Sequence, residues 1–300
     1  MDENETKSTP SGETAVRQAV TSHPRLFENN RYVYPVLSRR SGGISVGINL
    51  NPDKICNFDC IYCQVDRTVP PALRDVDEDR IVRELTELLD DALSGGLFQH
   101  PSFRSIPDQL KRINDIAFSG DGEPTTYPRF REIVEKTADV KRDFDLPEVK
   151  ITAITNCTRF HVPAVLDAFE VMNRNNGEIW AKLEAGTAEY YHLVERTKIS
   201  FQRIVDNLNL AARKWPLVIQ SLFMRVHGQP PPDVEILAFC SLLSDLLQQG
   251  GQLKNIQIYT VARKPAESYV AALSDAEVDR IAQTTRENLP GIPVESYYGA

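Results

Sequence analysis

The sequence predicts a parallel α/β fold built from six successive strand–helix units. Apolar runs with the two-residue period of a strand alternate with amphipathic segments that have the period of a helix. No linker of domain size interrupts the series, so one large domain is expected. A barrel and an open doubly wound sheet both fit this pattern, because strand order is not visible in a sequence.

The first unit illustrates the pattern. In the strand expected at 43–50, every second residue is apolar. The helix expected at 81–93 has one apolar face, and Gly95 and Gly96 follow it as a stop signal.

The other five units follow in chain order. Their strands are expected at 113–120, 149–155, 178–186, 217–226 and 255–261. Their helices are expected from about 128 and at 163–172, 200–215, 233–250 and 274–289. Pro128 suits a first helical turn, and Ser200 caps the helix that Pro216 ends. A short strand at 294–298 is expected to close the chain.

Composition limits the classes of function. The chain has 300 residues and 41% hydrophobic content. Its formal net charge of −8 argues against a broad nucleic-acid surface, and a local basic patch is the alternative. No stretch approaches the roughly 20 apolar residues of a membrane span. Residues 1–25 are polar without the apolar core of a secretory signal, so we expect a disordered tail, a folded domain at 26–300 and a cytoplasmic protein.

Three of the five cysteines are crowded into CNFDCIYC, as Cys56, Cys60 and Cys63. An odd number with this clustering indicates metal ligands in a reducing compartment, with zinc or an iron–sulfur cluster as the metal. Zinc needs a fourth ligand, and no further cysteine or histidine neighbours the triplet. A [4Fe–4S] cluster has four irons, so three thiolates leave one iron open to a cofactor or substrate. A structural zinc site remains the alternative.

CNFDCIYC resembles the CxxxCxxC signature of the radical S-adenosylmethionine (SAM) superfamily, including the aromatic Tyr62 before the last cysteine. The resemblance covers about residues 30–300 and implies a partial (βα)6 TIM-like barrel with parallel strands. It also implies a [4Fe–4S] cluster on Cys56, Cys60 and Cys63, with SAM bound to the open iron. Reductive cleavage of SAM would then give a 5′-deoxyadenosyl radical that abstracts hydrogen from substrate, with electrons from a flavodoxin- or ferredoxin-like donor.

The segment SGDGEPT is similar to the GGE-like motif that holds the SAM amino group in this family. Gly122 allows close backbone approach, Glu123 offers a carboxylate to an ammonium, and Pro124 stiffens the turn. Asp121 departs from the family pattern, which has glycine there. The alternative is an ordinary turn with solvated acids.

Two later segments complete the resemblance. In ITNCTRF, Asn156 belongs to a TNG-like motif, and Cys157 takes the usual glycine position as a free, partly buried thiol. KLEAGT ends the fourth strand, where the family places residues that contact the ribose, and Lys182 and Glu184 are the candidates. An exposed ion pair is the alternative for these two residues.

Polar residues also interrupt the last two long strands, where a parallel strand should be apolar. They are candidates to face a substrate, with a satisfied structural network as the alternative: Gln220, Ser221, Arg225, Tyr259 and Arg263. The motifs fall at or after the carboxyl ends of successive strands, which share one face in parallel α/β folds. One common site is therefore expected.

Within the superfamily, VGINLNPDKICNFDCIYCQ, SGDGEPT and IYTVAR resemble the branch that contains tRNA wyosine-synthesis enzymes. Three hypotheses follow: a single-cluster radical SAM oxidoreductase or transferase with an unidentified small or macromolecular substrate, a tRNA-modifying enzyme, and a metal-binding protein without SAM chemistry. The tRNA hypothesis is disfavoured, because wyosine enzymes carry additional cysteines before the signature and no cysteine precedes Cys56. A patch of Arg31, Arg39 and Arg40 could still bind a phosphate.

Overall fold

The computed structural model describes residues 27–299. The tail expected at 1–25 lies outside the described residues. The strands are β1 (Val33–Ser38), β2 (Gly43–Ile48), β3 (Ile113–Phe118), β4 (Lys150–Thr155), β5 (Gly177–Lys182), β6 (Leu217–Leu222), β7 (Arg225–Val226), β8 (Leu253–Tyr259), β9 (Val270–Ala271) and β10 (Val294–Tyr297).

All six expected helical regions are present, and a further short helix, α5, precedes the one that Ser200 caps. The α-helices are α2 (Glu78–Ser94), α3 (Phe130–Asp143), α4 (Pro163–Arg174), α5 (Ala188–Glu195), α6 (Phe201–Ala212), α7 (Asp233–Gln248) and α8 (Asp275–Asn288). Three single 3₁₀ turns accompany them: η1 (Leu97–Gln99), η2 (Asp108–Leu110) and η3 (Pro124–Thr126).

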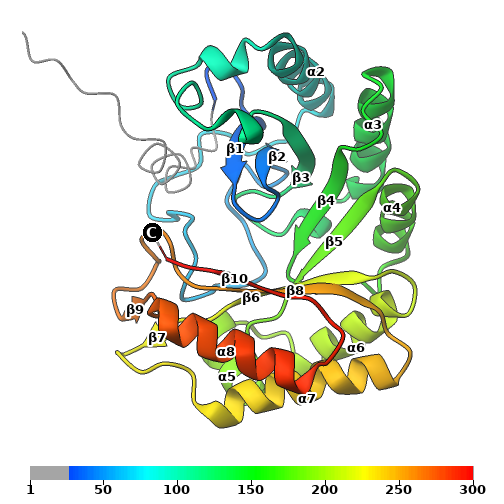
Figure 1. Ribbon diagram of the computed structural model, residues 1–300. Coiled ribbons are helices and arrows are strands. Elements are labelled where there is room, and N and C mark those ends of the chain that lie inside the picture. Colours follow the sequence, from blue (N-terminus) through cyan, green and yellow to red (C-terminus); the bar gives the residue numbers. More distant parts are fainter. Residues whose placement is uncertain (1–26, 300) are drawn as a thin grey trace, which may run out of the picture.

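The main sheet has eight strands in the order β1-β2-β3-β4-β5-β6-β8-β10. Only β1 runs antiparallel to its neighbour, and each other adjacent pair is parallel. The sheet curls, and the helices cover its outer side, α2 to α4 beside one half and α5 to α8 beside the other (Figure 1). The partial parallel barrel is thereby confirmed, and the doubly wound alternative is not adopted.

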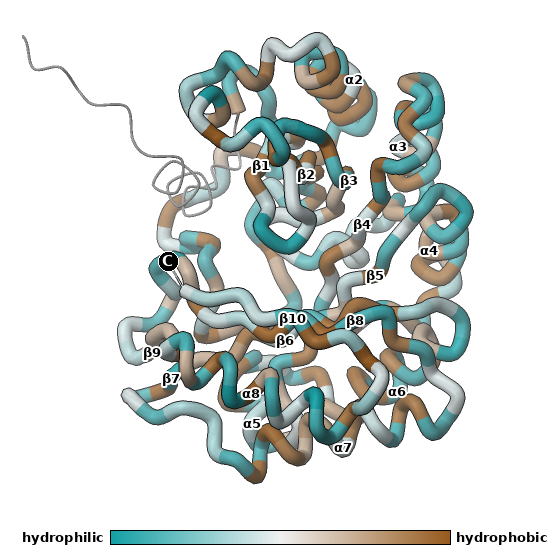
Figure 2. Tube along the Cα trace, viewed as in Figure 1, coloured by the Kyte–Doolittle hydropathy of each residue, from teal (hydrophilic) through white to brown (hydrophobic). Residues whose placement is uncertain are grey.

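The core lies between the sheet and these helices. Ile81, Leu85 and Leu89 of α2 are fully buried, because they recur at helical spacing on one face. Figure 2 shows hydrophobic residues along β6 and β8 and hydrophilic residues on the outer side of α8. Within residues 27–299, no helix combines the length and apolarity that a membrane crossing requires.

Strand β1 was not expected, and a buried carboxylate explains how it is held. Glu84 of α2 accepts hydrogen bonds from the backbone N–H groups of Arg31 (2.8 Å), Tyr32 (2.9 Å) and Val33 (3.1 Å). Arg80 donates to the same carboxylate at 2.7 Å. These bonds fix the start of β1 against α2, although β1 pairs with only one neighbour in the sheet.

The strand expected at 217–226 is also different from the prediction. It leaves the main sheet after Leu222, and Arg225–Val226 form a separate antiparallel pair with Val270–Ala271. The turn after β1 approaches the segment that follows β10, where Arg39 Nη1 donates to the Tyr298 carbonyl at 2.9 Å.

Candidate functional site

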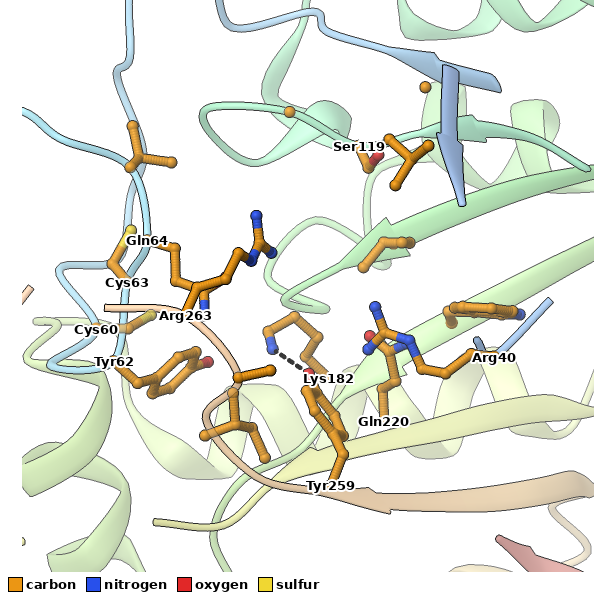
Figure 3. Close-up of a pocket in the computed structure, with 18 of the residues that line it drawn as sticks. Arg40, Cys60, Tyr62, Cys63, Gln64, Ser119, Lys182, Gln220, Tyr259 and Arg263 are labelled. Carbon is orange, nitrogen blue, oxygen red and sulfur yellow. Dashed lines mark hydrogen bonds between the residues drawn. The ribbon is translucent and has the colours of Figure 1, made fainter. Parts of the chain in front are cut away.

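A cavity of about 310 Å³ lies at the carboxyl ends of the parallel strands. It brings together most of the residues that the sequence singled out: Cys56, Cys60, Tyr62, Cys63, Gly122, Glu123, Asn156, Lys182, Glu184, Gln220, Tyr259 and Arg263. Figure 3 shows the cysteine segment on one side of this cavity and Arg40 on the opposite side, with Lys182 between them. The expected convergence of the motifs therefore occurs.

Three of the predicted residues are placed elsewhere. Ser221 is fully buried in β6 and does not line the cavity. Pro124 is buried at the first position of η3, behind the cavity wall. Arg225 lies on β7, where its guanidinium pairs with Glu277 at 2.6 Å and donates to the Gly228 carbonyl at 2.6 Å. These contacts match the structural alternative for Arg225 and not the substrate role.

The cysteine segment is fixed by backbone contacts with the end of α5. The N–H of Asp59 donates to the Glu195 carbonyl at 3.1 Å, and the N–H of Ile61 donates to the Val194 carbonyl at 2.9 Å. Arg196 adds a bond from Nε to the Asp59 carbonyl at 2.7 Å. The loop therefore has a defined position without any metal contact.

All three thiols are partly buried, and each has a distinct environment. Burial raises the pKa of Cys56 to about 11 and that of Cys60 well above its usual range. The Cys60 thiol donates to Glu195 Oε2 at 2.7 Å, whereas Cys63 Sγ accepts from Arg67 Nη1 at 2.8 Å. Metal ligation needs thiolates, so binding must release these protons.

A [4Fe–4S] cluster and a single metal ion require different spacings of the three thiolates. Thiolates on one zinc ion, with bonds of about 2.3 Å, would stand only about 4 Å apart. Within residues 27–299, no three cysteine, histidine or acidic side chains are grouped so as to hold one metal ion. A [4Fe–4S] cluster binds each thiolate through a different iron, which calls for wider spacing along a cavity wall.

The glycine turn packs tightly against the cysteine segment. A Cβ atom at Gly122 would lie 2.2 Å from the Ile55 carbonyl oxygen and 2.8 Å from Asn51 Cβ, so no side chain fits there. Asp121, the departure from the family pattern, accepts from Asn49 Nδ2 at 2.8 Å. Its carboxylate is thus tied to the residue that follows β2.

Glu123 is 3% exposed, and both of its carboxylate oxygens accept hydrogen bonds. Oε1 accepts from the N–H (3.1 Å) and hydroxyl (2.5 Å) of Thr125 and from the Thr155 hydroxyl at 2.7 Å. Oε2 accepts from the Asn156 N–H at 2.7 Å. Burial raises the pKa of Glu123 in spite of these bonds, which favour its ionised form. The carboxylate therefore joins the glycine turn to the end of β4.

The next segment links β4 to the cysteine loop. Asn156 Nδ2 donates to Asn57 Oδ1 at 2.7 Å, and Asn57 Nδ2 donates to the Thr158 hydroxyl at 2.7 Å. Cys157 is fully buried and has φ of 66°, a left-handed conformation that favours glycine. It is not among the residues that line the cavity.

Lys182 and Glu184 form a buried pair, not the exposed pair that was the alternative. Lys182 Nζ lies 2.5 Å from Glu184 Oε1, and Glu184 is 3% exposed. Lys182 also donates to the Tyr259 hydroxyl at 3.2 Å, and its Nζ lies 4.9 Å from the Tyr62 ring centroid. Burial favours the neutral amine, but the charges of Glu184, Tyr259 and Glu195 and the hydrogen bond to Glu184 together outweigh it, and the pKa of Lys182 is raised well above its usual range.

Sequence reasoning missed Glu195, which is 1% exposed and lies between two site residues. It accepts from the Cys60 thiol and, at 3.4 Å, from the Tyr62 hydroxyl. Burial and the neighbouring Glu184 charge raise the pKa of Glu195 well above its usual range. Glu195 does not itself line the cavity, whereas Arg67, Asp115 and Trp180 do so without a motif that marks them. The only sequence feature that could have indicated Glu195 is that a charged residue occupies the buried face of a helix.

Comparisons with known proteins place this geometry in context. A protein of Brachyspira hyodysenteriae described as GTPase Obg is 23% identical over 278 residues, covering 87% of this chain and 35% of that protein. UPF0026 protein MJ1312 of Methanocaldococcus jannaschii is 34% identical over 129 residues, covering 41% of this chain and 32% of that protein. The chain thus spans about a third of the length of these curated relatives.

Two solved structures share the fold. TYW1 with a lysine–pyruvate adduct has a TM-score of 0.55 at 16% identity, covering 91% of this chain and 81% of that one. A radical SAM methyltransferase from Sphaerobacter thermophilus has a TM-score of 0.59 at 13% identity, covering 89% and 69%. At these identities the likeness concerns the fold alone. The family model of the Radical SAM superfamily matches residues 50–240, and the chain belongs to this superfamily.

Proposed function

We propose that the protein uses one [4Fe–4S] cluster, held by Cys56, Cys60 and Cys63, to cleave SAM reductively and oxidise or modify an unidentified substrate. The observation that carries this proposal is that all three thiols line the same cavity as the glycine turn and the ends of β4 and β5. When bound, the cluster would supply the electron that releases a 5′-deoxyadenosyl radical from SAM, and this radical would abstract hydrogen from the substrate.

The chain's own residues have binding and positioning roles in this proposal. Gly122 and Glu123 hold the turn that presents backbone and carboxylate to the SAM ammonium, with Pro124 stiffening it from behind. Asn156 joins this region to the cysteine segment through its 2.7 Å bond to Asn57. Lys182 and Glu184 present a compensated charge pair toward the ribose side, beside Tyr62. The barrel wall excludes water from the reacting groups.

The electron is proposed to come from a flavodoxin- or ferredoxin-like donor. All five cysteines are free thiols, which fits a reducing compartment such as the cytoplasm. A tRNA-modifying activity is the second candidate, and the motif resemblance to the wyosine branch favours it. The net charge of −8 opposes it, since tRNA binding relies on clustered Lys and Arg that release counterions.

Anaerobic reconstitution tests the proposal and separates the candidates. We expect roughly four irons and four sulfides per chain, as one cluster requires. A colourless protein that binds zinc tightly would contradict the cluster. We expect no saturable tRNA binding at about 0.15 M salt, near physiological ionic strength. Eight irons, or tight salt-sensitive tRNA binding, would replace the first candidate with the second.

A further inference from the structure

The end of the cavity opposite the cysteines has a different chemical character. A series of contacts leads there from the cysteine segment: Lys182 faces Tyr62 on one side and bonds to Tyr259 on the other, and Arg40 lies over Tyr259. Under the proposed function, the cluster and SAM occupy the cysteine end. The opposite end is then where the substrate would bind, so the inference below rests on that function.

Arg40 belongs to the turn between β1 and β2 and extends into the cavity (Figure 3). Its guanidinium carbon lies 4.8 Å from the ring centroid of Tyr259 and 5.8 Å from that of Trp180. These rings hold the planar group in place by cation–π contact and leave its N–H donors available. Within residues 27–299, no carboxylate oxygen lies within ion-pairing distance of Arg40.

The other cations of the cavity differ from Arg40 in their partners. Lys182 is neutralised by Glu184 at 2.5 Å, and Arg67 is bonded to the Cys63 sulfur at 2.8 Å. Arg39 donates to a carbonyl oxygen, which carries no full charge. Arg263, in the loop after β8, points into the cavity from the side opposite Arg40 (Figure 3).

Electrostatics at this end favour an anion. Two guanidinium groups, those of Arg39 and Arg40, lie at this end, and Asp115 supplies one carboxyl group beside Arg40. Asp115 is 2% exposed, and burial raises its pKa to about 6. Burial and the adjacent charge of Arg40 lower the pKa of Arg39. Positive charge is therefore in excess, and a bound anion would relieve the repulsion between the arginines.

We infer that the substrate carries an oxyanion group, a carboxylate or a phosphate, that binds the guanidinium of Arg40 with Arg263 facing it. The planar fork of arginine matches both groups in a bidentate manner. The buried amide pair of Gln220 and Gln257, joined at 3.1 Å, adds polar surface beside this position. The whole cavity of about 310 Å³ is at the low end for ligand pockets, and SAM would share it, so the space beside Arg40 suits a small anionic group.

The test measures anion binding directly, on reconstituted protein with saturating SAM so that the SAM site is filled. Phosphate and malonate are titrated by calorimetry, and the unfolding temperature is compared with that in sodium chloride of equal ionic strength. We expect saturable binding of at least one probe, weakened ten-fold or more by Arg40→Gln and less by Arg40→Lys, which keeps the charge but loses the fork. Arg83→Gln, a matched change on the exposed face of α2, should bind like wild type.

The outcomes separate this inference from the proposed function. Preference for phosphate indicates a phosphate ester, and preference for malonate indicates a carboxylate. Absence of saturable binding, or equal affinity in wild type and a folded Arg40→Gln, overturns the inference. If anion binding fails in this way but 5′-deoxyadenosine still forms in the same sample, the proposed function stands and only the substrate assignment fails. If no cluster assembles, the proposed function fails, and the substrate assignment fails with it.

Discussion

Replacing Glu123 with glutamine tests the hydrogen-bond network at the glycine turn. The amide oxygen can take the position of Oε1, where Thr125 and Thr155 supply three donors. The amide nitrogen must then face the Asn156 N–H, which lies 2.7 Å from Oε2 in the wild type. One hydrogen bond to a charged acceptor is lost, and two buried donors oppose each other. We expect a loss of about 2 kcal/mol in unfolding free energy.

The same variant tests the proposed contact with SAM. Loss of a charge-assisted bond to the ammonium is worth on the order of 1–3 kcal/mol, or about 5- to 150-fold in affinity. Urea unfolding and SAM calorimetry on the reconstituted protein measure the two effects separately. Glu135→Gln on the exposed side of α3 is the control and should change neither beyond about 0.5 kcal/mol. If Glu123→Gln is as stable as wild type, the network does not contribute the stability assigned to it. If the variant keeps its cluster and binds SAM as tightly as wild type, Glu123 does not contact the SAM ammonium.

Three further changes have expected outcomes. Gly122→Ala should lower stability by about 1–3 kcal/mol and reduce iron content, because its Cβ would press on the Ile55 carbonyl, whereas Gly299→Ala, whose nearest contact is 3.3 Å, should retain both. Glu84→Gln should destabilise the protein by about 1–3 kcal/mol in urea, since it disturbs three backbone bonds to β1; an unchanged midpoint would contradict this. Burial opposes ionisation of Glu178, but the bonds from Lys150 and Lys254 outweigh it and lower its pKa. The contribution of Glu178 to the free energy of unfolding is thus complete above about pH 4.3 and is lost as the pH falls further. Glu178→Gln should therefore be less stable than wild type at neutral pH and equally stable in acid. A pH-independent difference would exclude this ion pair as the cause.

The fold was predictable where the pattern is local. The six parallel strand–helix units follow from apolar periods and from stop residues such as Gly95, which does adopt the left-handed helix end. Strand β1 was not predicted, because Pro35 interrupts the strand pattern and is tolerated only at a sheet edge. The exit of the chain from the sheet after Leu222 was hidden as well, since Phe223 and Met224 are fully buried and continue the apolar run.

The site was predictable where its residues belong to motifs at strand ends. The cysteines, Gly122 and Glu123 converge for that reason. Glu195 was missed because its contact with Cys60 joins positions 135 residues apart. Arg40 was noticed only as part of a surface patch, although the curvature of the sheet turns it into the cavity over Tyr259. Such placements depend on tertiary packing and have no local pattern.

The central claim is that Cys56, Cys60 and Cys63 together hold a cluster that cleaves SAM. The most direct measurement is 5′-deoxyadenosine formed per chain after anaerobic reconstitution, with SAM and a chemical reductant. The account predicts product from wild type and from Cys240→Ala, which removes a buried thiol on α7 far from the motif. It predicts neither product nor brown chromophore from Cys60→Ala. Product from Cys60→Ala equal to that of wild type, or none from an iron-replete wild type, would contradict it.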